Sequence, residues 1–126
     1  MRILLDTHPL LWWLSASPLL SVSAREMIRD PENTIFISAV SLWEIWLKRS
    51  LGKLQLPVDF AERLAAESFE SLTLTTSQTR QVSLLTWHHR DPFDRMLIAQ
   101  AQFEKLVLLT ADEALTEYGA VVHLAY

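Results

Sequence analysis

The fold of this chain is decided by residues 89–101, which read HRDPFDRMLIAQA. Asp91 is a good N-cap residue, Pro92 suits the first helical position, and an apolar helical pattern follows. The residues three, four and seven positions after Asp94 are apolar, so Asp94 shares its helix face with the stripe that packs on the rest of the fold. A carboxylate that faces a core needs a partner, a proton or a cation. This helix therefore predicts both a packing face and a candidate site.

The composition predicts one globular domain that covers residues 1–126. A chain of 126 residues that is 50% hydrophobic can bury a sizeable core, and it is too short for two ordinary domains. It has no cysteine, which excludes disulfides and thiolate metal sites and fits a reducing cytosol. The apolar N-terminal run is interrupted by Asp6 and His8, so we expect no signal peptide and no membrane span, and a cytoplasmic protein.

Charge and glycine content narrow the function classes. The formal net charge of -4 argues mildly against nucleic-acid binding, unless acidic residues hold divalent cations where the substrate lies. Glycine occurs only at positions 52 and 119. The sequence therefore contains no glycine-rich phosphate loop, which excludes both a P-loop and a dinucleotide-binding fingerprint.

Strand-like and helix-like segments alternate along the chain. Short apolar or β-branched runs predict strands at residues 3–5, 34–38, 72–75, 106–109 and 121–124. Helical patterns with capping or stop signals predict helices at residues 7–14, 23–30, 40–51, 59–69, 77–87, 92–101 and 112–118. This alternation is typical of an α/β layer fold with a mostly parallel sheet, in which ligands bind outside the carboxyl ends of the strands.

Four carboxylates occupy comparable places in these units: Asp6 after the first strand, Glu44 in the helix after the second, Asp94 in the first turn of its helix, and Asp112 after the fourth strand. Because the carboxyl ends of parallel strands share one edge, we expect Asp6 and Asp112 to lie there, with helix starts beside them. Carboxylates that converge stay ionised together only if cations neutralise them. Hard oxygen ligands of this kind suit Mg²⁺ or Mn²⁺.

Each of these carboxylates also has a purely structural interpretation. Asp6 and Asp112 could be helix N-caps, and Asp94 could complement a helix dipole. Glu44 could close a capping box or pair with Lys48 one turn later. The joint pattern of the four residues is more informative than any one of them, and it favours a metal site.

Four motifs together resemble the ordered acidic motifs of the PIN-domain family. They are LLDTH at 4–8, SLWEIWLK at 41–48, HRDPFDRMLIAQA at 89–101 and LLTAD at 108–112, and they span nearly the whole chain. The similarity is greatest to VapC-like toxins of prokaryotic type II toxin–antitoxin pairs. It implies a three-layer α/β/α sandwich around a parallel sheet, and a hydrolase that is a Mg²⁺- or Mn²⁺-dependent ribonuclease.

The resemblance also implies roles for individual residues and partners. Asp6, Glu44, Asp94 and Asp112 match the family's acidic quartet, which holds the metal and carries catalysis. Thr110 matches the Thr or Ser that is frequent near the last acid. The implied partners are an RNA substrate, a second copy of the chain in a homodimer, and an antitoxin protein whose C-terminal segment covers the site.

Residues around the quartet allow more than one interpretation. Asp91 is most simply the N-cap of its helix, with an alternative role in orienting the ligands. Arg90 and Arg95 could contact phosphate or orient a carboxylate, or could form solvated salt bridges. Adjacent Trp12 and Trp13 cannot both point inward from one helix, so at least one should be partly exposed and available to a partner. The four histidines lack the spacing of a zinc site.

Three functions are compatible with these residues. The leading hypothesis is a metal-dependent endoribonuclease that hydrolyses RNA phosphodiester bonds. The alternative is a non-catalytic PIN-like module that binds protein or RNA. A phosphatase with Asp6 as its nucleophile comes last, because that chemistry usually needs a second acid two residues later and His8 occupies that place.

Overall fold

The computed structural model describes all 126 residues and contains one five-stranded sheet in which every pairing is parallel. The strands are β1 (Arg2–Leu5), β2 (Thr34–Ser38), β3 (Glu70–Leu72), β4 (Val107–Thr110) and β5 (Val122–Leu124), in the order β3-β2-β1-β4-β5. Central β1 is paired on both sides, with Leu5 opposite Ile37 of β2 and Leu109 of β4.

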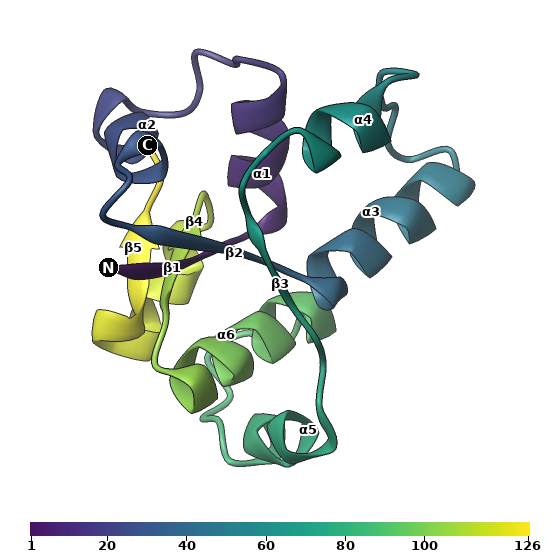
Figure 1. Ribbon diagram of the computed structural model, residues 1–126. Helices are drawn as coiled ribbons and strands as arrows, with labels where there is room; N and C mark the ends of the chain where they lie inside the picture. Colours follow the sequence, from purple (N-terminus) through teal and green to yellow (C-terminus); the bar gives the residue numbers. More distant parts are fainter.

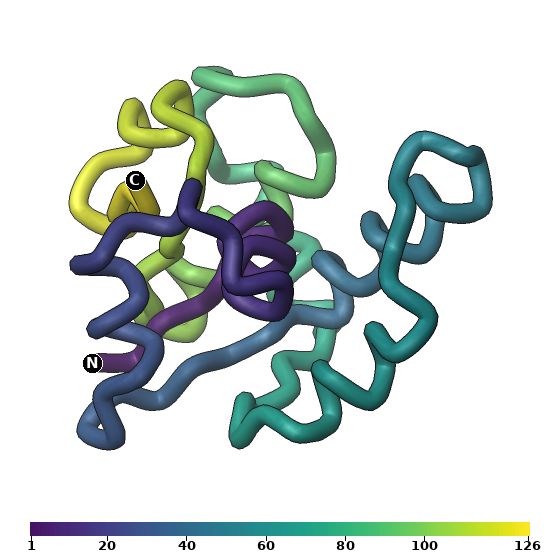
Figure 2. Tube along the Cα trace, turned by 90° about the horizontal axis from the view of Figure 1, so that it is seen from above, coloured from purple at the N-terminus to yellow at the C-terminus, as the bar shows by residue number.

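Helices cover both faces of this sheet. They are α1 (Thr7–Leu14), α2 (Val22–Arg29), α3 (Ala39–Ser50), α4 (Phe60–Ala65), α5 (Thr76–Ser83), α6 (Pro92–Glu104) and the 3₁₀ segment η1 (Glu113–Val121). Helices α1, α2 and α4 lie on one side of the sheet and α5 and α6 on the other (Figure 1). Helix α3 continues from the end of β2 and, seen from above, leads out to one side of the sheet (Figure 2). The predicted three-layer α/β/α sandwich is confirmed. None of these helices is long and apolar enough to cross a membrane.

The core has two parts because side chains of a strand alternate between its faces. On β1, Ile3 and Leu5 belong to one apolar cluster and Leu4 to the other, and all three are fully buried. The same alternation separates Leu109 from Leu108 on β4. Since both faces of the central strands are covered, these strands have to be continuously apolar, as their sequences are.

The strand order reverses direction next to β1. Strands β2 and β3 follow one another on one side of β1, and β4 and β5 lie on the other side. The crevice between the carboxyl ends of β1 and β4 is therefore the point at which ligands bind in open α/β sheets. Asp6 lies there, and its backbone N–H donates to the carbonyl of Leu109 at 2.9 Å.

Several predicted element boundaries were wrong. The third strand ends at Leu72, because Thr75 caps α5 through a capping box with Gln78. The next helix ends at Ser83, short of the predicted residue 87, and the helix predicted at 59–69 is only the short α4. Helix α2 begins after Ser21, whose hydroxyl accepts from an N–H of the first turn.

Candidate metal centre

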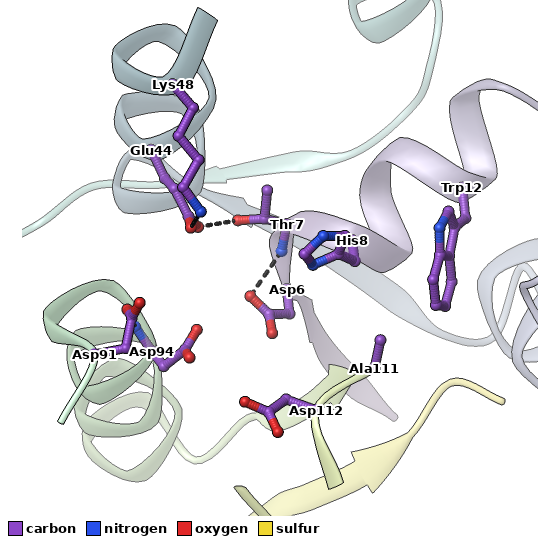
Figure 3. Close-up of a pocket in the computed structure, with 10 residues that line it drawn as sticks. All are labelled: Asp6, Thr7, His8, Trp12, Glu44, Lys48, Asp91, Asp94, Ala111 and Asp112. Atoms are coloured by element: carbon purple, nitrogen blue, oxygen red, sulfur yellow. Dashed lines mark hydrogen bonds and ion pairs between the residues drawn. The ribbon is translucent and has the colours of Figure 1, made fainter. Parts of the chain in front are cut away.

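A pocket of about 460 Å³ opens at the carboxyl ends of β1 and β4. Five carboxylates line it: those of Asp6, Glu44, Asp91, Asp94 and Asp112. The side chains of Asp6, Asp94 and Asp112 point toward a common space, with Glu44 above them on α3 (Figure 3). The structure thus brings together all four residues of the predicted quartet from four separate parts of the chain.

Asp6 is held by two hydrogen bonds at the end of β1. As the N-cap of α1 it accepts from the Thr7 backbone N–H at 2.7 Å, and its other oxygen accepts from the Thr110 hydroxyl at 2.7 Å. The Thr110 hydroxyl also accepts from the Asp112 N–H at 3.1 Å, so Thr110 connects two of the acids. Burial raises the pKa of Asp6, while these hydrogen bonds from Thr110 and Thr7 lower it and the charge of Glu44 raises it further.

Glu44 is buried on α3 and is fixed by two partners. One oxygen accepts from the Thr7 hydroxyl at 2.6 Å, and the other pairs with the Lys48 ammonium one turn later at 2.5 Å. The hydrogen bond to Glu44 raises the pKa of Lys48. The helical ion pair expected from the sequence is therefore present, while the N-cap of α3 is Ser38.

Asp94 faces the pocket from the first turn of α6. Its backbone N–H is capped by the side chain of Asp91 at 3.0 Å, which confirms Asp91 as the N-cap. Burial raises the pKa of Asp94 to about 7, and the charges of Asp6 and Asp91 act in the same direction. The proximity of these anions means that a cation in the pocket would favour the ionised form of Asp94.

His89 belongs to the site, although the sequence reasoning did not select it. Its Nε2 lies 2.9 Å from Asp94 Oδ2 and 3.6 Å from Asp112 Oδ2. One ligand atom from each of these three residues lies within 4.8 Å of the others. The histidine is in the loop before α6, where no periodicity orients a side chain, so only its place next to the DPFDR motif could have indicated it.

Arg95 is placed differently from the prediction. Its side chain is buried and does not line the pocket; its guanidinium donates to backbone carbonyls and to the hydroxyl of Tyr118. The carbonyl acceptors are those of Val82, Leu85, Thr86 and His89. The guanidinium also lies over the Trp87 ring, 3.7 Å from its centre. Arg95 thus forms no ion pair with a carboxylate of the pocket, and its contact with substrate phosphate stays a prediction.

The donors of the pocket fit a divalent cation. Asp94 and Asp112 offer carboxylate oxygens that lie, with a nitrogen of His89, within 4.8 Å of one another, and Asp6 and Glu44 line the same pocket. Hard oxygen donors with net negative charge suit Mg²⁺ or Mn²⁺. The Lys48 ammonium pairs with Glu44, and the charges of Asp91 and Asp94 also raise its pKa. One lysine does not balance the five carboxylates that line the pocket.

Comparisons with known proteins are consistent with this fold. A family model described as PIN domain matches residues 3–121. A search of curated protein sequences found no significant match. At 17% identity the chain resembles a structure of VapBC2 from Rickettsia felis bound to a DNA fragment from their promoter (TM-score 0.71, covering 98% of this chain and 97% of that one).

Two further solved structures have the same fold. DNA-bound VapBC from Salmonella typhimurium is 17% identical, with a TM-score of 0.69 over 100% of this chain and 99% of that one. A toxin–antitoxin complex from Klebsiella pneumoniae is 18% identical, with a TM-score of 0.65 over 98% of each chain. At such low identity, these likenesses concern the fold alone.

Proposed function

The chain belongs to the PIN-domain family, and from this premise we propose that it is a metal-dependent endoribonuclease, the VapC-like toxin of a toxin–antitoxin pair. The observation that carries the proposal is the convergence of Asp6, Glu44, Asp94 and Asp112 on one pocket. Carboxylates that gather at the switch point of a parallel sheet match the requirements of metal-assisted phosphodiester hydrolysis.

Asp6, Asp94 and Asp112 would hold the ion, with Glu44 at its side. When bound, Mg²⁺ or Mn²⁺ supplies a water of lowered pKa and stabilises negative charge on the phosphate. The chain carries a net charge of -4, so the phosphates of RNA would be repelled from this pocket if its carboxylates were not neutralised. A divalent cofactor and an RNA substrate are therefore compatible in the same place.

The surrounding residues keep the acids in position. Thr110 orients the Asp6 carboxylate and restrains the backbone of Asp112, and Thr7 with Lys48 restrains Glu44. Such contacts to ligating carboxylates fix their direction and are costly to remove. Thr110 is thus proposed as a residue that orients the acids, and Asp91 as one that shapes the start of α6.

The proposed partners are an antitoxin protein and a second copy of the chain. The structures from Rickettsia felis and Salmonella typhimurium are complexes of VapBC, and the one from Klebsiella pneumoniae is a toxin–antitoxin complex. Trp43 is 59% exposed on α3, and the centre of its ring lies 4.8 Å from that of Phe93 on α6. Exposed aromatic side chains of this kind are enriched in protein interfaces.

RNA cleavage by the purified chain tests the enzymatic proposal. End-labelled RNA is incubated with Mg²⁺ or Mn²⁺ and either the wild type or Asp94→Asn. Loss of a carboxylate that holds the ion should exceed the 10- to 100-fold loss typical of outer-shell changes, so we expect cleavage to slow by about 100-fold or more.

Asp59→Asn is the matched control, because Asp59 is exposed at the N-cap position before α4 and forms an ion pair with Arg63. We expect it to cleave at the wild-type rate. Equal cleavage by wild type and Asp94→Asn, or none by the wild type with either ion, would contradict the proposal and favour the non-catalytic binding module.

A further inference from the structure

The loop that precedes α6 brings a nitrogen donor to the acidic pocket. His89 Nε2 is 2.9 Å from Asp94 Oδ2 and 3.6 Å from Asp112 Oδ2. The His89 side chain is 23% exposed, compared with 16% for Asp94 and 40% for Asp112. The partly exposed imidazole therefore contacts two carboxylates of the pocket, which come from different elements of the fold.

These separations suit three ligands of one ion. Two neighbouring ligands of an octahedral ion, each bound at about 2.1 Å, lie about 3 Å apart. The ligand atoms of His89, Asp94 and Asp112 all lie within 4.8 Å of one another, and the two histidine distances bracket that spacing. Small rotations of the side chains would thus place all three around a single cation.

The backbone of the loop is also held in place. The buried guanidinium of Arg95 donates to the carbonyls of Thr86 at 3.1 Å and of His89 itself at 3.4 Å. Tyr118 donates its hydroxyl to the same Thr86 carbonyl at 3.1 Å. A ligand side chain on a restrained backbone pays less conformational entropy when it binds an ion.

We infer that His89 is a ligand of the divalent ion and gives the site a preference for first-row transition ions such as Mn²⁺ over Mg²⁺. This inference rests on the proposed function, since it concerns the same site. Carboxylates and water suit Mg²⁺, whereas an imidazole nitrogen is a ligand that transition ions accept more readily. A site with one nitrogen ligand and several carboxylate oxygens should therefore bind Mn²⁺ more tightly than Mg²⁺. A site with oxygen ligands alone distinguishes the two ions poorly.

The test uses Mn²⁺ alone as a paramagnetic probe of the chain of residues 1–126. Pulsed electron paramagnetic resonance of bound Mn²⁺ should show coupling to an imidazole nitrogen, and ¹⁵N-labelling of histidine should change that signal. His89→Gln should abolish the coupling. Calorimetric titration should show Mn²⁺ affinity falling by about tenfold or more, with Mg²⁺ affinity changed by less than about threefold.

His88→Gln is the matched control. His88 is exposed, the centre of its ring lies 5.0 Å from that of Tyr118, and it forms no ion pair with a carboxylate of the pocket. It should keep both the nitrogen coupling and the Mn²⁺ affinity. Circular dichroism of both variants checks that the fold is retained, and the ¹⁵N measurement on the wild type needs no variant.

The outcomes separate this inference from the proposed function. Bound Mn²⁺ without nitrogen coupling in the wild type, or coupling that persists in His89→Gln, overturns the role of His89 and leaves the nuclease proposal in place. Nitrogen coupling that is present in the wild type and lost in His89→Gln, together with no RNA cleavage by the wild type, supports the role of His89 over that of pocket-lining His8 and removes the nuclease proposal. If the wild type binds neither ion, both are wrong.

Discussion

Asp94 and Arg95 are neighbours in sequence on α6, but the groups around their two charges differ. The Arg95 guanidinium is surrounded by acceptors, namely four backbone carbonyls and the Tyr118 hydroxyl. The Asp94 carboxylate lies near Asp6 and Asp91, which carry charge of its own sign, and has His89 as its side-chain hydrogen-bond partner. One helix therefore carries a cation whose N–H groups are hydrogen-bonded and, next to it in sequence, an anion that lies close to other anions.

The difference indicates that the charge of Arg95 stabilises the fold, whereas the charge of Asp94 belongs to a candidate functional site. Buried polar groups with a structural role are hydrogen-bonded, and Arg95 meets this requirement with neutral partners. A carboxyl group with like charges beside it destabilises the folded state and is typical of functional sites. The contrast predicts that removing the Arg95 charge weakens the fold, whereas removing the Asp94 charge strengthens the metal-free fold.

The largest expected effect is that of Arg95→Met. The substitution removes the Arg95 hydrogen bonds to four backbone carbonyls, of which that of Thr86 keeps the Tyr118 hydroxyl as a donor, and it removes the contact with Trp87. We expect the free energy of unfolding to fall by about 3 kcal/mol, measured by urea denaturation. Arg90→Met is the control, because Arg90 is exposed, and it should change stability by less than about 0.5 kcal/mol. Similar losses from both variants would remove the contrast.

Asp94→Asn should have a smaller effect of the opposite sign in metal-free protein. Because the pKa of Asp94 is about 7 in the fold and 3.8 in the unfolded chain, the folded state binds this proton more tightly. The stability that the folded state gains from this proton is fully present below pH 3.8 and is lost as the pH rises through about 7. As the pH rises from 5 to 7, the free energy of unfolding of the wild type should therefore fall by about 2 kcal/mol more than that of Asp94→Asn.

Urea denaturation at several pH values, in the presence of a chelator, measures this difference. The two proteins should be closest in stability at pH 5, and Asp94→Asn should be the more stable at pH 7. Saturating Mn²⁺ should make the wild type the more stable of the two proteins, since an ion that binds the folded state more tightly in the wild type stabilises it more. Parallel pH curves for the two proteins would contradict the raised pKa.

The smallest expected change in stability is that of Thr110→Val. The valine keeps the shape of a fully buried side chain but loses the hydroxyl that donates to Asp6 and accepts from Asp112. We expect a loss of about 1 kcal/mol in unfolding free energy and a 10- to 100-fold loss in Mn²⁺ affinity, measured by calorimetry. Thr110→Ser retains the hydroxyl and should keep most of the affinity; equal losses from both would show that packing, not the hydroxyl, matters.

Local structural roles of the acids could be predicted from the sequence, and most were found. Asp6, Asp91 and Asp112 cap helical segments, and Glu44 pairs with Lys48. These interactions join residues at most a few positions apart, so residue type and spacing are sufficient to indicate them. The side chains that have these structural roles thus also line one pocket, and their role in metal binding stays a proposal.

The sequence by itself determined the α/β class, the buried central strands and the residues able to form an acidic quartet, because alternation and helical periodicity are local signals. Tertiary structure alone decided three things: which side of the sheet β4 joins, where the Arg95 side chain turns, and that His89 meets Asp94 and Asp112. The physical reason is distance along the chain and loop conformation. The order of strands in the sheet depends on pairing between segments about a hundred residues apart, such as β1 and β4. An irregular loop has no periodic pattern that predicts the direction of a side chain.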